Sequence, residues 1–524
     1  MNSCVSARGG VHAPWGGRRH TVSVYRSADF QSAGSRNCIL QALRPDRVPW
    51  NLSERCRLQI GDTAEYNSAL REKAADHIRP SRRPQAFAWS KHLWRPVFYT
   101  ISTGEGAGRN TRGACGPHDR LYSASQKSET SGVTSSSHRK FDVAIVGAGP
   151  AGSAAALALA RAGAKVLLIE KTYLPRYKTC GGGLVNRACQ LLAHHAEIPV
   201  ERACCVAELN FVRQGLHFVA RRQSSIICMT MRSALDHQLA LAAQRAGVEL
   251  KQGCALKSIC SLDRGVEIDT THGQFWAEFI VAADGANSAV AKQTGWDALP
   301  NLIPALECEV FVKAHDFERL NRAARFDFEV IPSGYAWVFP KQHHLSIGVL
   351  SMKRGRVDLH GAFERYLAIL GLHAPEKIER HGYVIPVTPR RGPFARGRVL
   401  LTGDAAGLVD PVTAEGLTYA IRSGQLAAQS LAEAAFDPGE VASRYRALVA
   451  QEILPDLKAG RILAWMLYRQ PRLTAWLFRK HGVALSDLMT DIVAGQTTYR
   501  ALLGEIGNYL KLLKPAPRWS PANT

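Results

Sequence analysis

The clearest functional motif in the sequence is a set of three glycines, Gly147, Gly149 and Gly152, whose spacing is typical of a dinucleotide-binding turn. In a G-x-G-x-x-G turn between a buried strand and a helix, backbone can approach a pyrophosphate, and the helix N-terminus offers unpaired N–H groups. Glu170 ends the next apolar run, where it can accept a hydrogen bond from a ribose hydroxyl. The predicted dinucleotide contacts are Gly147, Ala148, Gly149, Pro150, Ala151, Gly152, Glu170 and Lys171.

Cys180 precedes three consecutive glycines, Gly181–Gly183. Such a run lets backbone pass against a flat ligand and adopt positive φ. We therefore expect Cys180 to act as a weak acid near a reaction centre, with a buried and inert thiol as the alternative. Arg176 and Lys178 stand just before it and can hold a phosphate or another substrate anion.

Aromatic residues alternate between Pro332 and Pro340. Tyr335, Trp337 and Phe339 are two residues apart, so in a strand their side chains project from one face. Three aromatic rings on one face suit a long apolar substrate or a flavin ring. An ordinary aromatic core stripe is the alternative.

Two turns with an acidic residue follow predicted strands far along the chain. Asp284-Gly285 comes after the apolar run Phe279–Ala283, and Gly403-Asp404 comes after Val399–Leu401. Ligands of doubly wound sheets lie at the carboxyl ends of the strands, so both turns are expected beside the dinucleotide. Asp404 is then placed to accept from a ribityl hydroxyl.

Two predicted helix starts complete the candidate site. One helix begins near Glu415, Gly416 and Leu417, and its N–H groups would stabilise negative charge on the N1–O2 edge of a reduced flavin. Arg232 starts a second helix, where it can reach a ligand. A salt-bridged surface arginine is the alternative for Arg232.

Taken together, these motifs resemble the geranylgeranyl reductase family of flavoproteins, within the group that shares a p-hydroxybenzoate hydroxylase-like fold. The resemblance covers about residues 139–510. Its most specific part is P-x-x-Y-x-W-x-F-P, which is matched in full from Pro332 to Pro340. The other matches are Gly147–Gly152, Cys180–Gly183, Asp284-Gly285 and Gly403–Gly407.

The resemblance implies an extended FAD, with Glu170 on the adenosine ribose, Arg232 near the flavin chain and Asp404 on the ribityl. It also implies a substrate tunnel beside Cys180 and the face from Tyr335 to Phe339. Two positions depart from the pattern. Val290-Ala291-Lys292 stands where members often have arginine, and Gly407 stands where hydroxylases commonly have histidine, which favours a reductase.

These residues must be positioned by strands and helices, and the predicted order of those strands and helices indicates an α/β fold with four parts. These are a disordered basic extension (1–138), a Rossmann-like FAD-binding domain (139–300 and 396–430, with inserted covering strands in 195–228), an antiparallel-sheet substrate domain (301–395) and a helical C-terminal region (431–524).

The net charge of +22 is concentrated near the start of the chain. Residues 1–140 hold 22 Lys and Arg against 10 Asp and Glu, so they contribute +12. Three interpretations of this segment compete: an organellar transit peptide, a basic arm, and translation from a misplaced start. We favour the third, because the methionine after Met1 is Met229; Val133 is a candidate for the true start.

The twelve cysteines form no metal-type quartet, and no apolar run reaches the length of a membrane span. We therefore expect no metal and a cytoplasmic protein with reduced thiols. The apolar segment Ile462–Leu477 with interleaved arginines suggests peripheral membrane contact or, equally, a helical cap. Nucleic acid is not an expected partner, and the oligomeric state is open.

These features favour an FAD-dependent reductase that transfers hydride from flavin N5 to an isoprenoid C=C, in a geranylgeranyl lipid, another prenyl lipid or a quinone tail. The expected catalytic residues are Cys180, Tyr335, Trp337 and Phe339. NAD(P)H or another external donor would reduce the flavin. The alternatives are a flavin monooxygenase or halogenase of the same fold, and an electron carrier that reduces quinone without saturating a chain.

Overall fold

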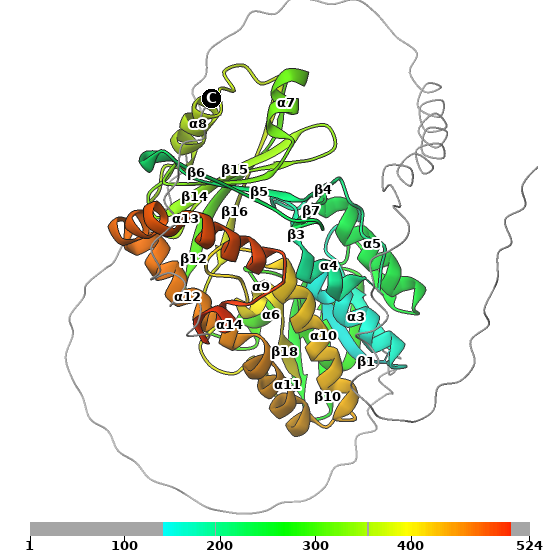
Figure 1. Ribbon diagram of the computed structural model, residues 1–524. Helices are drawn as coiled ribbons and strands as arrows, with labels where there is room; N and C mark the ends of the chain where they lie inside the picture. Colours follow the sequence, from blue (N-terminus) through cyan, green and yellow to red (C-terminus); the bar gives the residue numbers. More distant parts are fainter. Residues whose placement is uncertain (1–139, 194, 354–355, 505–524) are drawn as a thin grey trace, which may run out of the picture. The chain divides into compact units, whose positions relative to one another are not determined.

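The computed structural model describes residues 140–193, 195–353 and 356–504 (Figure 1). The expectation for residues 1–138 lies outside this part. The described residues form the α/β fold that the sequence predicts, with two large sheets, a small sheet and helices packed against them. None of the helices in this part is both long and apolar enough to cross a membrane.

A β-α-β unit begins the described chain. β1 (Lys140–Val146) and β2 (Val166–Ile169) are mostly buried and pair in parallel, and α3 (Pro150–Arg161) connects them. α3 is rich in alanine, so α10 (Leu417–Glu433) approaches it closely: a Cβ on Gly424 would collide with the Ala151 carbonyl oxygen. A helix from the C-terminal part of the chain thus packs directly on the helix that follows the glycine turn.

β1 lies near the centre of an eight-stranded sheet. β11 (Gly273–Ala282) and β2 flank β1 in parallel, and β18 (Val399–Leu401) pairs in parallel with β11. The remaining strands are β8 (Glu249–Lys251), β9 (Leu256–Leu262), β10 (Gly265–Thr270) and β17 (Ala395–Arg396). The carboxyl ends of β1, β11 and β18 therefore meet at one edge of the sheet, as expected.

The second large sheet has seven strands and is antiparallel except at one pair. In spatial order these strands are β16 (Lys377–Pro386), β12 (Leu302–Phe311), β15 (Leu345–Ser351), β14 (Gly334–Pro340), β13 (Ala324–Phe328), β5 (Val206–Phe211) and β6 (Leu216–Arg221). We expected residues 195–228 to cover the FAD-binding domain. In the structure β5 and β6 extend this second sheet, because β5 pairs in parallel with β13 and antiparallel with β6.

Alternation along the strands gives the seven-stranded sheet two different faces. Tyr335, Trp337 and Phe339 of β14 pack in one core, and Ala336 and Val338 pack in another. The second core includes α8 (Leu359–Ile369), while the first includes residues of α10, α12 (Leu454–Arg469) and α13 (Pro471–Val493). The aromatic face therefore points toward the C-terminal helices and the FAD-binding part of the fold.

The other elements are short connections and helices. They are β3 (Gly183–Val185), β4 (Arg202–Cys204) and β7 (Ile227–Met229), which form the small sheet, the 3-10 turn η1 (Val212–Gln214), and α4 (Asn186–Leu192), α5 (Arg232–Arg245), α6 (Ala289–Gln293), α7 (Ala314–Leu320), α9 (Gly403–Ala406), α11 (Pro438–Glu452) and α14 (Tyr499–Gly504).

Candidate functional site

The glycine turn between β1 and α3 is shaped by close backbone contacts. Gly147 has φ +104°, and a Cβ there would collide with the Ala283 carbonyl; a Cβ on Gly152 would collide with the Gly147 carbonyl oxygen. At Gly149, by contrast, the nearest atom to an added Cβ is an Arg232 nitrogen at 3.9 Å. The side of Gly149 is therefore the open side of the turn, where a pyrophosphate can approach backbone N–H groups.

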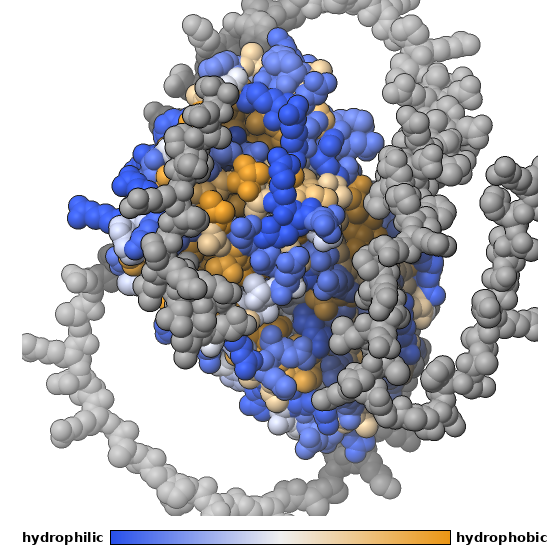
Figure 2. Space-filling model, viewed as in Figure 1, coloured by the Kyte–Doolittle hydropathy of each residue, from blue (hydrophilic) through white to orange (hydrophobic). Residues whose placement is uncertain are grey.

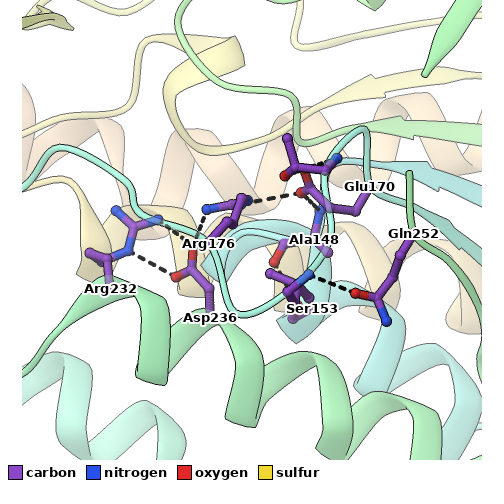
Figure 3. A network of polar contacts seen from close by, with 9 residues as sticks. Ala148, Ser153, Glu170, Arg176, Arg232, Asp236 and Gln252 are labelled. Atoms are coloured by element: carbon purple, nitrogen blue, oxygen red, sulfur yellow. Dashed lines mark hydrogen bonds and ion pairs between the residues drawn. The ribbon is translucent and has the colours of Figure 1, made fainter. Parts of the chain in front are cut away.

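Glu170 lies against this turn and belongs to a charged network (Figure 3). Its Oε2 accepts a hydrogen bond from Ala148 N at 3.0 Å. Arg176 lies between two acids, with its guanidinium 3.2 Å from Glu170 Oε2 and 3.0 Å from Asp236 Oδ2. Burial alone would raise the pKa of Glu170, but Arg176, together with hydrogen bonds from Thr172 and Ala148, holds that pKa below its usual value. Glu170 is thus kept ionised as a hydrogen-bond acceptor. The next residue, Lys171, is exposed.

Arg232 begins α5 and continues this network. It forms a bidentate ion pair with Asp236 at 2.8 and 2.9 Å, and both side chains are largely buried. Cys180 also interacts electrostatically with Arg232. Arg232 therefore forms a salt bridge, but a buried one inside the candidate site rather than one on the surface. Through Asp236 and Arg176, this ion pair connects Glu170 to Cys180.

The two acidic turns converge on the same sheet edge. Gly147 lies beside Ala283 and Asp284, so the end of β11 meets the turn after β1. A Cβ on Gly403 would lie 3.3 Å from the Ala151 Cβ, and one on Gly416 would lie 3.3 Å from Asp404 Oδ1. Burial raises the pKa of both Asp284 and Asp404.

Several buried polar atoms at this edge have no hydrogen-bond partner among the described residues. They include Asp284 Oδ1, Glu415 Oε2 and Thr418 Oγ1. Such atoms are rare in folded proteins because each carries an unrepaid desolvation cost. Glu415 lies just before α10, where Gly416 is the N-cap and Leu417 the first residue, and burial raises the Glu415 pKa to about 7. These atoms can form hydrogen bonds with a ligand that has many hydroxyl and N–H groups, and FAD is such a ligand.

The Cys180–Gly183 loop is pressed against the aromatic face of β14. A Cβ on Gly181 would lie 2.9 Å from Trp337 Nε1 and 3.1 Å from the Phe339 ring. Gly182 has φ +66°, and a Cβ there would collide with the Thr230 carbonyl. The loop thus needs glycine for close approach, and Cys180 interacts electrostatically with Tyr335 on this face. Trp337 Nε1 is itself buried without a partner among the described residues.

The aromatic face continues away from this loop as a line of rings. Ring centroids are 6.2 Å apart for Trp337–Phe339, 6.1 Å for Tyr335–Trp337 and 5.8 Å for Phe328–Tyr335. The Tyr335 hydroxyl donates to the Thr413 carbonyl, which fixes the ring beside α10. At the far end lies a cavity of about 250 Å³, lined by Phe211, Phe328, Ile331, Leu467, Tyr468 and Pro471 among others.

A buried charged cluster under the glycine loop escaped the sequence-based prediction. Lys341 is fully buried and donates from Nζ to the carbonyl oxygens of Gly181, at 2.7 Å, and Thr230, at 3.0 Å. Glu307 and Glu309 are almost fully buried and interact electrostatically with Lys341. The signal in the sequence was two acids at alternating positions within an apolar strand, which is costly unless they are partnered.

The two carboxylates have distinct partners. Glu307 accepts from the Tyr177 hydroxyl at 2.6 Å and from Ser346 Oγ at 3.0 Å, while Glu309 lies 2.8 Å from His344 Nε2. Burial and then the neighbouring Glu309 raise the pKa of Glu307 to about 8. At neutral pH, therefore, Glu307 holds a proton.

This protonation makes stability depend on pH. The unfolded chain releases the Glu307 proton near the ordinary value of 4.5 and the folded protein near 8, so the folded state binds more protons in between. We expect the Glu307 contribution to the free energy of unfolding to fall as pH rises from about 4.5 to about 8. Urea unfolding across this range should show a flatter profile for Glu307→Gln than for the native protein; parallel profiles would contradict the assignment.

Comparisons with known proteins identify the family of this chain. A family model described as an FAD-binding domain matches residues 140–440, more than half of the chain. The geranylgeranyl diphosphate reductase of Oryza sativa is 31% identical, over 56% of this chain and 67% of its own. Digeranylgeranylglycerophospholipid reductase 1 of Methanopyrus kandleri is 30% identical, over 63% of this chain and 91% of its own.

Solved structures share the fold. A geranylgeranyl bacteriochlorophyll reductase-like protein from Thermoplasma acidophilum aligns with a TM-score of 0.59 and 23% identity, over 72% of this chain and 96% of its own. The flavin-dependent brominase Bmp2 aligns with a TM-score of 0.54 and 18% identity, over 68% and 94%. With the sequence relatives and the FAD-binding match, the chain belongs to the geranylgeranyl reductase family of FAD-dependent oxidoreductases.

Proposed function

We propose that this protein saturates C=C bonds of an isoprenoid chain, with FAD bound at the edge where β1, β11 and β18 end. The observation that carries the proposal is the contact between the Cys180–Gly183 loop and the aromatic face of β14. That contact joins the FAD cradle to the aromatic face of Tyr335, Trp337 and Phe339. The named reductases among the relatives support the same chemistry.

The aromatic line suits a long chain. Tyr335, Trp337 and Phe339 lie in a single buried stripe, and Phe328 extends it toward the cavity beside Tyr468. An isoprenoid is repetitive and uncharged, so ring faces can bind several of its units without hydrogen bonds. In this proposal the stripe orients the double bond and keeps water away from it.

When bound and reduced, FAD supplies the hydride. The protein must then deliver a proton to the other carbon. Cys180 or an ordered water is the proposed source, because Cys180 interacts with both Arg232 and Lys178. Burial, with Arg232 next in effect, lowers the pKa of Lys178 to about 8, and its Nζ lies 3.1 Å from the centre of the Tyr383 ring. We therefore propose Lys178 as a proton relay beside Cys180.

The electron donor in this proposal is external. One G-x-G-x-x-G fingerprint is present in the sequence, and FAD would occupy it, so NAD(P)H or another donor must reach the flavin from a different side. The proposed substrates are geranylgeranyl lipids, other prenyl lipids or a quinone tail.

The proposal is tested by mixing the anaerobically reduced protein with geranylgeranyl diphosphate, a geranylgeranyl phospholipid or a menaquinone. We expect the oxidised flavin absorbance to return with at least one of them. A flavin that stays reduced with every isoprenoid, or that reoxidises only when oxygen and an aromatic substrate are added, would instead favour a monooxygenase or halogenase. Reoxidation by quinone with an unchanged tail would favour an electron carrier.

A conservative change at Trp337 should affect the substrate and spare the fold. The Trp337 N–H has no hydrogen-bond partner among the described residues. Trp337→Phe therefore reduces the aromatic surface without leaving a hydrogen-bond acceptor unpaired. We expect kcat/KM for a C20 substrate to fall about tenfold, equivalent to about 1.4 kcal/mol, and the free energy of unfolding to fall by about 1 kcal/mol because the smaller ring fills less of the core.

Trp296→Phe is the matched control. Trp296 is also buried, but its N–H donates to the Pro393 carbonyl at 2.9 Å, away from the aromatic face. This variant should lose about 1 kcal/mol of stability and keep its kcat/KM. Equal activity losses in the two variants would remove the special role of Trp337.

A further inference from the structure

The helices α12 and α13 expose an unusual set of side chains. Between Leu457 and Ser486, every exposed residue is either cationic or apolar. The cations are Lys458, Arg461, Arg469, Arg472, Arg479 and Lys480, and the same thirty-residue stretch contains no Asp or Glu. We call this the α12–α13 surface. Figure 2 shows apolar side chains among hydrophilic ones on the face where these helices lie.

The apolar members of this surface are large and well exposed. Ile462 is 60% exposed, Trp465 56%, Trp476 54% and Val483 72%. Ile462 and Trp465 are three residues apart on α12, and Trp476 is three residues after the exposed Leu473 on α13, so each pair lies on one side of its helix. Val483 follows the kink at His481. The Lys480 ammonium lies 5.4 Å from the centre of the Trp476 ring. Exposed tryptophans among lysines and arginines are typical of a helix that lies in a membrane interface.

The same helix pair borders the cavity at the end of the aromatic line. Leu467 and Tyr468 of α12 and Pro471 and Thr474 of α13 line the cavity together with Phe211 and Phe328. The α12–α13 surface and the cavity are thus two sides of one helical hairpin. An apolar chain leaving a bilayer at this surface would meet the cavity next.

The charges identify the occupant of the surface. A second copy of the chain would bring the same cations together, which is unfavourable. Residues 505–524 carry three cations and a single acid, so their sequence does not complement the surface either. A nucleic acid would satisfy the cations, but it offers no apolar phase for Ile462 and Val483. A bilayer with anionic headgroups satisfies both kinds of side chain.

We propose that α12 and α13 dock on the surface of a bilayer that contains anionic phospholipid. The aliphatic and indole side chains enter the boundary between headgroups and acyl chains, and the six cations contact phosphates. Docking does not depend on the reaction. Only the corollary that an isoprenoid enters the cavity from the bilayer depends on the proposed function.

Flotation of the full chain with its flavin tests the proposal. Vesicles of phosphatidylcholine alone should bind weakly, and vesicles with added phosphatidylglycerol should bind at least about tenfold more tightly, because each interfacial cation adds attraction to an anionic surface. Two variants should each weaken this binding at least about tenfold: Arg461→Glu with Arg472→Glu, and Trp465→Ser with Trp476→Ser. All four residues are exposed, so both variants should keep their flavin and Tm.

The matched control lies on α8. Arg365→Glu with Ile369→Ser changes an exposed cation and an exposed aliphatic residue outside the α12–α13 surface, and it should bind vesicles like the native protein. Equal loss in this control would overturn the proposal, as would failure of the native protein to bind anionic vesicles.

Other occupants give different results, and each of these would also overturn the proposal. A dimer in light scattering that the Trp465→Ser, Trp476→Ser variant abolishes would assign the surface to a second copy. Binding to transfer RNA that competes with vesicles and survives the tryptophan changes would assign it to a polyanion. The vesicle-binding test needs no substrate and no reaction. A negative result there would therefore reject membrane docking without bearing on the reductase proposal.

Discussion

Gly149→Val should yield a folded protein without flavin. The nearest atom to an added Cβ at Gly149 is 3.9 Å away, and this N-cap residue has φ −79°, which valine accepts. The new side chain would instead fill the space through which a pyrophosphate approaches the start of α3. We expect FAD affinity to fall about 100-fold, which corresponds to about 2.7 kcal/mol. Absorbance of the purified protein and titration with added FAD measure this.

Gly439→Val controls for the cost of valine at a helix start. Gly439 is exposed in the first turn of α11, and the nearest atom to an added Cβ is Asp437 Oδ1 at 3.4 Å. Both variants should lose about 1 kcal/mol or less of stability, and only Gly149→Val should lose the flavin. A yellow Gly149→Val protein with native FAD affinity would place the pyrophosphate elsewhere.

Lys341→Met should destabilise the protein strongly. It removes the two hydrogen bonds that hold the carbonyls of Gly181 and Thr230, and it takes the buried ammonium away from Glu309, which is left beside His344. Removing one partner of a buried charged group typically costs about 3 kcal/mol or more, and we expect that loss in urea unfolding at pH 7. Cys180 should also react faster with thiol reagents, because the loop that follows it loses its anchor.

Glu309→Gln tests whether the charges explain this loss. In the background of Lys341→Met it removes a buried negative charge that has lost its neighbouring ammonium, so it should restore part of the lost stability; in the native background it should be destabilising. This sign reversal is the coupling expected of interacting groups. Additive effects would show that Lys341 acts through packing alone.

Local patterns in the sequence predict much of this fold. The apolar runs before Gly147, Asp284 and Gly403 are the parallel strands β1, β11 and β18, and their ends converge as doubly wound topology requires. The alternation of Tyr335, Trp337 and Phe339 is confirmed as one buried face of β14. In each case a single element contains the whole signal.

Long-range pairing escaped the same reasoning. Nothing local in Val206–Phe211 says that it pairs in parallel with β13, more than one hundred residues later. Lys341 looks like an exposed strand end, and only the fold reveals that it is buried beneath Gly181. The position of Arg176 between Glu170 and Asp236 likewise depends on where α5 packs.

A single-turnover measurement tests the reductase proposal most directly. Reduced protein is mixed without oxygen with a limiting amount of a geranylgeranyl lipid in deuterated water, and the extracted lipid is weighed by mass spectrometry. Saturation predicts one reduced double bond for every flavin oxidised, with deuterium at both carbons of that bond, because the flavin N5–H exchanges with the solvent before transfer. A lipid of unchanged mass after the flavin has been oxidised would contradict it.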